Sequence, residues 1–501
     1  MQKLSVRKVK TASGATAVQV VVYRGKRVTI VKHMGSARTE IELSSLRRKA
    51  RIYAEENSPQ QSLFPRAKQP QILLVDRARC TSVTHHFARD FLHAAAHACG
   101  LSLLDPLFLD LALMRIIEPT SKLRTLTLLE RYFGILYSQR IYRKMTSFYK
   151  QKEQIEKIAL TCARKHLKED LYLVLYDVTT LYFESFKEDL FRKPGFSKDD
   201  KSRQPQVIVG LLVTRSGFPL AHEVFDGNTF EGKTMLPLLR NFAKINNVTI
   251  PIVVADAAML SEENTRVLDA EGISYIVGAR LANTPLSFVE KISAALNKED
   301  GKTIRFPSKH GEMICSFSCA RYNKDSREMT KLIAKAKHLI ARNEAGRRAK
   351  FIQKTGRGTV TLNKALIAKA NYLLGIKGYC TNVPETILPN TAIIAHYHDL
   401  WKVEQAFRMS KSDLAARPIF HYKEEAIRAH LLLCFIALMI GKYLEIATRM
   451  SLRNIRDLIW SVTEAHIEDT LSKESFTFRS PMDEIMRSPL RQLIHKWEIP
   501  H

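Results

Sequence analysis

An apolar and aromatic run with an acidic residue in its middle constrains the fold of this chain most strongly. The run is LYLVLYDVTTLYF, residues 171–183, and its β-branched and aromatic side chains are typical of a strand. Asp177 falls on the same alternating face as Leu173 and Leu175. Burying a carboxylate on such a face is unfavourable unless it is paired or bound to a metal ion. The pattern therefore predicts a core strand with a functional acid.

The segments after this strand predict the order of a mixed sheet. QVIVGLLVT and FPLAHEVFD are joined by a short turn at residues 215–217, so the first three strands are expected to be antiparallel. A helix near 234–244, the strand PIVVAD, a helix near 261–270 and the strand ISYIVGA follow. Three antiparallel strands followed by alternating helices and strands are the layout of a ribonuclease H-like domain. The predicted fold class is α/β, with a mixed sheet and covering helices.

The net charge predicts a polyanionic partner. Lys and Arg total 78 against 50 Asp and Glu, a formal charge of +28. Avoiding self-association needs a far smaller imbalance, so this excess favours nucleic acid over a membrane surface. Charge alone does not separate DNA from RNA.

Cysteine spacing and hydropathy limit the other possibilities. The seven cysteines form no CxxC pair, so neither a disulfide framework nor a zinc site is predicted. Residues 1–11 hold no apolar leader, and the longest apolar run, 431–440, is too short to span a bilayer. We therefore expect a cytoplasmic, nucleoid-associated protein.

Sequence pattern also divides the chain into regions. Apolar stretches between residues 16 and 34 predict a β-hairpin, and three prolines at 58–70 predict a linker. After residue 283 the sheet pattern stops, and a strongly basic helical stretch follows. The predicted domains are a β-rich N-terminal module at 1–60, a helical DNA-binding region at 82–168, a core at 169–282 and 383–450, an α+β insertion domain at 283–382 and a basic helical C-terminal region at 451–501.

Two further acids complete a candidate metal site. Asp256 ends the strand PIVVAD, where a C-terminal strand edge opens toward a site, although a helix N-cap would explain it as well when taken singly. Mg²⁺ prefers carboxylate oxygens, and two-metal phosphoryl transfer needs ions roughly 4 Å apart that shared acids hold. Glu404 is the third candidate, because its neighbours repeat at helical spacing and form one stripe. The stripe consists of Tyr397, Leu400, Glu404, Arg408 and Lys411. A solvated helix face is the alternative for these charges.

Three separated segments resemble the DDE transposases of bacterial insertion sequences, in the insertion-sequence-four superfamily with its Y-x2-R-x3-E-x6-K signature. YDVTTLYFES and the following GFSKDDKSRQPQVIVGLLV resemble the first-aspartate region of its long-insertion branch. VVADAAMLSEEN resembles the second-aspartate region, and YHDLWKVEQAFRMSKSDLAARPIFH the signature helix. The likeness runs in register from about residue 3 to residue 445.

The resemblance implies a function and a site. It implies cleavage of DNA at transposon ends and strand transfer into target DNA, with Asp177, Asp256 and Glu404 binding two Mg²⁺ or Mn²⁺ ions. It also implies Tyr397 and Lys411 as contacts to the transposon end, terminal inverted repeats and target DNA as partners, and a homodimer in the paired-end complex.

The chain departs from the family pattern at two places. The signature arginine is replaced by Leu400, so a phosphate contact made there must come from a neighbour, Lys402 or Arg408. Ala257 and Ala258 follow the second aspartate, where relatives often have an arginine and a glycine.

Two other functions stay open from the sequence. Residues 227–234, GNTFEGKT, match the P-loop pattern between a strand and a helix, which indicates a nucleotide hydrolase with Lys233, Thr234 and Asp256 around Mg²⁺. Interleaved charges in the preceding strand and Glu231 inside the loop oppose that function. The other alternative is a catalytically decayed protein that binds DNA ends. His86, His93 and His97 share a helical face, and we expect them to be structural.

Overall fold

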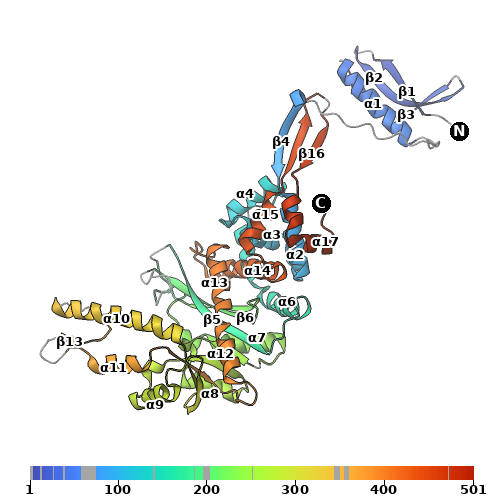
Figure 1. Ribbon diagram of the computed structural model, residues 1–501. Helices are drawn as coiled ribbons and strands as arrows, with labels where there is room; N and C mark the ends of the chain where they lie inside the picture. Colours follow the sequence, from blue (N-terminus) through green and yellow to red (C-terminus); the bar gives the residue numbers. More distant parts are fainter. Residues whose placement is uncertain are drawn as a thin grey trace. The chain divides into compact units, whose positions relative to one another are not determined.

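The computed structural model describes most of the chain and divides it into two compact units. It describes residues 4–11, 14–25, 27–37, 40–57, 75–138, 141–184, 187–195, 204–250, 252–342, 350–354, 360–471 and 473–500. The smaller unit is Met1–Val83 with Glu464–Arg479, and the larger unit is Thr84–Thr463 with Ser480–His501 (Figure 1). The predicted linker at 58–70 lies outside the described residues.

The smaller unit contains two three-stranded sheets. The first consists of β1 (Leu4–Lys10), β2 (Thr16–Arg24) and β3 (Arg27–Ala37), antiparallel in that order, with α1 (Glu40–Glu56) packed against it. The predicted hairpin is the β2–β3 pair. Val18, Val20 and Ala50 are fully buried between sheet and helix, because alternate valines of β2 face α1.

The second small sheet corrects the prediction of a helical C-terminal region. It is built from β4 (Ala78–Thr84), which follows the 3₁₀ turn η1 (Val75–Arg77), and from β15 (Glu464–Asp469) and β16 (Ser475–Arg479), in the order β16-β15-β4. Residues 451–501 are therefore not all helical. Both strands have only five or six residues, a length at which alternation gives little signal.

One eight-stranded mixed sheet organises the larger unit. Its order is β10-β11-β14-β9-β8-β5-β6-β7. The strands are β5 (Leu173–Tyr182), β6 (Gln206–Thr214), β7 (Pro219–Asp226), β8 (Ile252–Ala255), β9 (Ser274–Ala279), β10 (Thr303–Ser308), β11 (Gly311–Phe317) and β14 (Ile376–Thr381). As the sequence predicted, β5, β6 and β7 are antiparallel. β8 and β9 then run parallel to β5.

Helices connect and cover this sheet. They are α7 (Met235–Asn246) between β7 and β8, α8 (Glu262–Ala270) between β8 and β9, and α9 (Leu286–Leu296) before β10, with the short 3₁₀ turns η3 (Glu231–Lys233), η4 (Ala257–Met259) and η5 (Leu281–Asn283). β6 is buried along its whole length. Such a continuously apolar strand is typical of the centre of a covered sheet.

The segment predicted as an insertion is not separate from this sheet. Strands β10, β11 and β14 extend it antiparallel beyond β9, so the sheet does not stop at residue 283. The pairing of β9 with β14 joins residues about 100 positions apart in sequence, which no local pattern signals.

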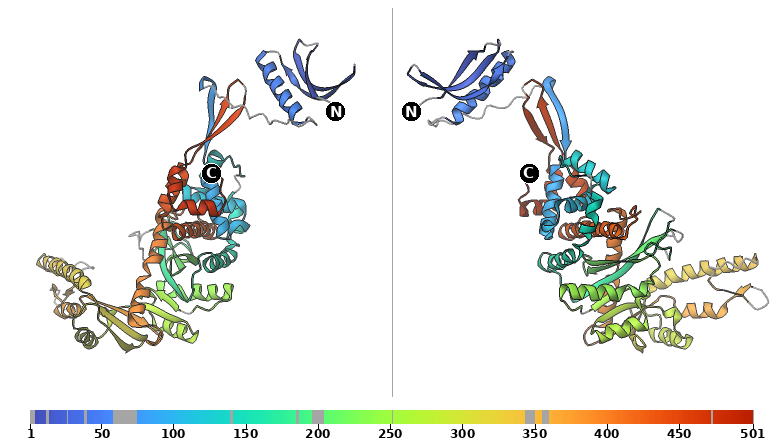
Figure 2. Two further views of the ribbon diagram at one scale, coloured as in Figure 1. Left: turned by 45° about the vertical axis from the view of Figure 1, so that its right-hand side comes forward. Right: turned by 180° about the vertical axis from the view of Figure 1, so that it is seen from behind.

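Only the middle of that segment leaves the sheet. It consists of α10 (Cys319–Ala341), β12 (Ile352–Lys354), β13 (Val360–Leu362) and α11 (Lys364–Tyr372), around a small core of Met329, Ala336 and Phe351. Figure 2 shows α10 extending away from the sheet in both views.

The remaining helices of the larger unit come from its first and last thirds in sequence. They are α2 (His86–Ala98), η2 (Leu101–Leu103), α3 (Pro106–Ile117), α4 (Lys122–Phe133), α5 (Ile141–Tyr149), α6 (Lys152–Lys165), α12 (Asn390–His398), α13 (Trp401–Ser412), α14 (Glu424–Thr448), α15 (Leu452–Ser461), α16 (Asp483–Arg487) and α17 (Leu490–Lys496). His93 has a structural role there, as predicted, because its Nε2 lies 2.7 Å from Oδ1 of the buried Asp110.

The apolar helix α14 lies at the centre of this layer. By length and composition it is a helix that could cross a membrane, but 83% of its most apolar stretch is buried inside the unit. It packs against α2, α3, α5, α13 and β7. Gly441 allows α15 and α13 to pack closely on α14, since an added methyl group would lie 2.9 Å from Leu452 Cδ2 and 3.2 Å from the sulfur of Met409. α14 thereby supports the helix that bears Glu404.

Candidate active site

The sheet register places two of the predicted acids side by side. β5 and β8 are parallel neighbours, and Tyr176 pairs with Ala255. Asp177 follows Tyr176 on β5, and Asp256 follows Ala255 at the end of β8. The two aspartates therefore lie at the same level on strands about 4.8 Å apart. A pair of carboxylates so close is unfavourable without cations nearby.

A hydrogen bond from the backbone N–H of the next residue fixes the direction of each aspartate. Oδ1 of Asp177 accepts a hydrogen bond from Val178 N at 2.7 Å. Asp256 caps η4, and its Oδ1 accepts from Ala257 N at 2.6 Å. The capping alternative for Asp256 is therefore correct as a local role, and it coexists with the place of Asp256 in a shared cavity.

The predicted stripe spans two helices instead of one. α12 ends at His398 and α13 begins at Trp401, with Asp399 and Leu400 between them in helical conformation. Because the backbone stays near helical geometry through this junction, the spacing of the stripe is kept. Arg215 Nε donates to Asp399 Oδ2 at 2.8 Å and ties the junction to the end of β6.

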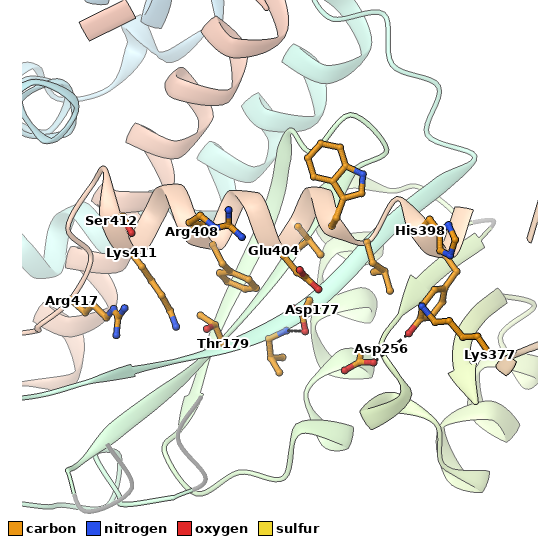
Figure 3. A pocket seen from close by; sticks show the side chains of 16 residues that line it. Asp177, Thr179, Asp256, Lys377, His398, Glu404, Arg408, Lys411, Ser412 and Arg417 are labelled. Atoms are coloured by element: carbon orange, nitrogen blue, oxygen red, sulfur yellow. Dashed lines mark hydrogen bonds between the residues drawn. The ribbon is translucent and has the colours of Figure 1, made fainter. Parts of the chain in front are cut away.

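A cavity of about 920 Å³ brings the predicted site residues together. All three acids line it, and so do the four other members of the stripe, Tyr397, Leu400, Arg408 and Lys411. Figure 3 shows Glu404 pointing from α13 toward Asp177, with Asp256 on the far side. Lys402 does not line this cavity, so of the two replacements considered for the missing arginine only Arg408 is placed at it.

Tyr397 is held against Asp256. Its hydroxyl donates to Asp256 Oδ1 at 3.4 Å, and burial, followed by the charge of Asp256, raises the pKa of Tyr397 well above its usual value. The ring fits because residue 278 is glycine. A Cβ there would lie 2.5 Å from the Tyr397 hydroxyl. Tyr397 therefore stays a protonated hydrogen-bond donor.

Lys377 on β14 is a member of the site that the sequence did not reveal. Its Nζ lies 4.5 Å from the centre of the Tyr397 ring, and it lines the cavity. Burial and the charge of Arg321 lower the pKa of Lys377, against the opposing effect of Asp256 and Glu404. β14 reaches the cavity only through its long-range pairing with β9, so local sequence held no signal for this lysine.

Cations line the end of the cavity beyond Glu404. Lys411 and Arg417 lie at that end, away from Asp256 (Figure 3). Arg408 comes from the helix face between them and Glu404. The cavity thus combines an acidic part with a basic part, which suits a metal ion next to a phosphodiester chain.

The P-loop alternative does not fit the structure. Thr234 is fully buried, and its hydroxyl donates to the Glu231 carbonyl at 2.6 Å and accepts from Tyr176 at 2.8 Å. That hydroxyl is not available to a metal-bound nucleotide. The preceding strand β7 is an antiparallel edge strand, and Gly227 packs closely on the backbone of Lys193 and Gln206.

Comparison with known proteins decides the family. The family model described as "Transposase DDE domain" matches residues 168–440, more than half of the chain, and this span includes all three acids. The chain belongs to the DDE transposase family. This transposase therefore acts on DNA, and its family implies nuclease and transesterification chemistry with divalent metal ions.

A solved structure resembles the transposase more distantly. It is titled "Cryo-EM structure of piggyBac transposase synaptic complex with hairpin DNA (SNHP)". The two proteins are 10% identical, and the match covers 83% of this chain and 76% of that chain with a TM-score of 0.35. No curated protein matches this transposase.

Proposed function

We propose that this transposase cuts DNA at the ends of its own mobile element and joins the 3′ ends to target DNA, with Asp177, Asp256 and Glu404 as its catalytic metal ligands. One observation supports this most: three carboxylates from distant parts of the family domain line one cavity together with cations. We further assign the chain to the insertion-sequence-four superfamily and its core to the ribonuclease H-like class, on the signature residues and the strand order β7-β6-β5-β8-β9.

The donor set of the cavity fits hard divalent ions. All three candidate ligands are carboxylates, and the register keeps two of them within reach of a shared ion. Two Mg²⁺ or Mn²⁺ ions held there would activate the attacking water or 3′-hydroxyl and stabilise the leaving oxygen. Local hydrogen bonds to Oδ1 of Asp177 and Asp256 orient both carboxylates before an ion binds.

The other cavity residues would position the DNA strand. Arg408, Lys411 and Lys377 are suited to contact the phosphates on either side of the scissile bond. Tyr397 holds Asp256 through its hydroxyl and offers an aromatic edge toward the bound strand end. Leu400 carries no charge, so Arg408 would make the phosphate contact that the signature arginine makes in the family. Terminal inverted repeats and target DNA are the proposed partners, with a homodimer pairing two ends.

A cleavage assay on linear DNA that bears the element's terminal repeats tests this function. The assay uses the full chain with Mg²⁺ and no nucleotide. We expect cleavage at the repeat, and a loss of roughly 100- to 1,000-fold in Asp177→Asn and in Glu404→Gln, because removing one ligand charge disrupts ion binding. Glu263→Gln is the matched control, since this exposed acid of α8 lies outside the cavity.

Three other outcomes of this assay would each contradict the proposed function. An absolute requirement for ATP, abolished by Lys233→Ala, would restore the P-loop alternative. Repeat-specific binding without cleavage at any metal concentration would indicate a decayed transposase. Cleavage that survives in both triad variants would show that the catalytic residues are misassigned.

A further inference from the structure

A second large cavity lies next to the catalytic one within the larger unit. Its volume is about 850 Å³, within the range of roughly 300–1,000 Å³ that holds organic ligands. It is lined by residues of α3, α4 and α5, by the connection between α3 and α4, by the segment that follows α13, and by the first two turns of α14. Arg417 lines both cavities, so they meet at this side chain.

The floor of the second cavity holds two buried cations. Arg115 is 8% exposed and Lys122 is 6% exposed. Lys122 Nζ donates to His430 Nδ1 at 2.6 Å, and His430 Nε2 donates to the Ala416 carbonyl at 3.1 Å. Arg115 donates to the Leu414 carbonyl at 3.3 Å. Neutral groups therefore accept these hydrogen bonds, and the positive charges are not compensated by them.

Two other buried lysines among the described residues each lie next to a carboxylate. The buried Lys152 lies 2.8 Å from Glu156, and the buried Lys442 lies 2.9 Å from Glu445. Among the described residues that line the second cavity, none is acidic. Burial and the charge of Arg115 lower the pKa of Lys122 to about 7. A buried pair of like charges is unfavourable, and an anion in the cavity would relieve that cost.

Two helix N-termini add to the positive potential. Ser121, the N-cap of α4, and Lys423, the N-cap of the 25-residue α14, both line the cavity. Unpaired N–H groups and the helix dipole favour an anion at such a place. The acid at the start of α14, Glu424, is outside the lining and pairs with Arg428 at 2.8 Å.

Aromatic side chains stand at the rim of the cavity. Phe420 is 68% exposed and Tyr422 is 66% exposed, and both line it. One face of Tyr422 is covered by Arg192, 5.3 Å from the ring centre. Exposed aromatic rings next to a basic pocket are the combination that binds an unpaired nucleotide, by stacking its base and neutralising its phosphate.

We infer that this cavity binds one unpaired nucleotide of a DNA strand that passes Arg417 from the catalytic cavity. Its phosphate sits at Lys122, Arg115 and the two helix N-termini, and its base stacks on Phe420. The inference rests on the proposed function only in taking DNA as the ligand. It assigns no step of the cleavage reaction to these residues.

Fluorescence anisotropy of a labelled single-stranded oligodeoxynucleotide tests the inference. The full chain carries Asp177→Asn in every sample, and the buffer contains EDTA, so binding is separated from cleavage. We expect Lys122→Met to weaken binding about tenfold and to reduce the slope of log K against log salt by about one. Arg124→Met is the matched control, because it removes one charge from the exposed face of the same helix.

A second variant keeps the test decisive if Lys122→Met folds poorly. Phe420→Ala changes an exposed side chain and should weaken oligonucleotide binding about tenfold through lost stacking. If both variants bind like Arg124→Met, the inference is wrong. This result is independent of the cleavage assay, because neither protein is required to cut.

Inorganic phosphate distinguishes a free anion from a nucleotide. Its binding to the full chain can be followed by ³¹P nuclear magnetic resonance in the same buffer. We expect weak phosphate binding that Lys122→Met abolishes and Phe420→Ala leaves unchanged. If Lys122→Met abolishes phosphate binding but leaves oligonucleotide binding intact, the cavity is a site for free anions and the assignment to DNA is overturned.

Discussion

At the scale of single residues, burial was the most useful signal. Asp177 could be proposed from its apolar strand alone, and it lines the catalytic cavity. Lys377 could not, because its six-residue strand joins the cavity only by a long-range pairing. The local sequence around Asp256 was consistent with both a cap and a cavity residue, and the structure shows both.

The fit of Tyr397 against Gly278 gives a prediction. Gly278→Ala should lower the cleavage rate at least tenfold, because the added methyl group displaces the Tyr397 hydroxyl from Asp256. Tyr397→Phe alone should reduce the rate about threefold, through loss of a long hydrogen bond. Single-turnover cleavage measures both. The double variant should cleave faster than Gly278→Ala, and an unchanged rate in Gly278→Ala would count against the positioning role of Tyr397.

The buried charge of Lys122 gives a prediction about stability and pH. Its pKa is about 7 in the folded protein against an ordinary value of 10.5, so between these values the folded state binds fewer protons than the unfolded state. Stability should therefore rise with pH above 7, while below pH 7 the full penalty of the charge is present. The neighbouring groups are Arg115, His421, His430 and Cys434. The two histidine pKa values are lowered far below this window, so they do not titrate in it.

Lys122→Met should be more stable than wild type at pH 7, by at most about 4 kcal/mol, and the difference should shrink toward pH 9.5. Urea unfolding of both proteins at the two pH values measures it. If the stability difference between the two proteins is the same at both pH values, the charge of Lys122 does not destabilise the folded state.

At the scale of elements, the sheet position was predictable for strands that follow one another in the sequence. It was not predictable for strands that join the sheet through a partner far away in the sequence. β5 to β9 each have a local apolar pattern and short connections. β10, β11 and β14 were assigned to a separate insertion because only the pairing of β14 with β9, about 100 residues away in sequence, joins them to the rest of the sheet. β15 and β16 pair with each other locally, and they were missed because each has only five or six residues.

The turn after β7 gives a prediction that separates packing from nucleotide binding. Gly227→Ala should destabilise the protein by roughly 2–3 kcal/mol, because a methyl group would overlap the carbonyl oxygens of Gln206 and Lys193. Lys233→Ala removes an exposed side chain. It should leave the stability nearly unchanged and the cleavage rate within twofold of wild type. Thermal unfolding and the nucleotide-free cleavage assay of both variants, Gly227→Ala and Lys233→Ala, measure these effects. A specific loss of cleavage in Lys233→Ala would be the contrary result.

At the scale of the whole molecule, residues near the two ends of the larger unit build one helical layer. α17 contributes Leu490 and Ile494, both fully buried, and Trp497 packs against Phe91 of α2 with ring centres 5.3 Å apart. α17 (Leu490–Lys496) lies within the region 451–501 that was predicted to be helical. Its partner could not be predicted, because nearly 400 residues separate it from α2.

This packing predicts that the end of the chain is needed for stability. Leu490→Ala with Ile494→Ala should destabilise the protein by roughly 4–6 kcal/mol, through two buried cavities. Arg491→Ala, on the exposed face of the same helix, should have little effect. Thermal unfolding compares the two, and equal unfolding temperatures would mean that α17 does not belong to the core.

Mn²⁺ binding to the full chain, followed by electron paramagnetic resonance, tests the central claim most directly. Wild type and the Glu263→Gln control should bind Mn²⁺ equally. Asp177→Asn, Asp256→Asn and Glu404→Gln should each weaken binding at least tenfold, because each removes a carboxylate ligand from the same cavity. Undiminished Mn²⁺ binding in all three variants would contradict the assignment of these carboxylates as the metal ligands of the transposase.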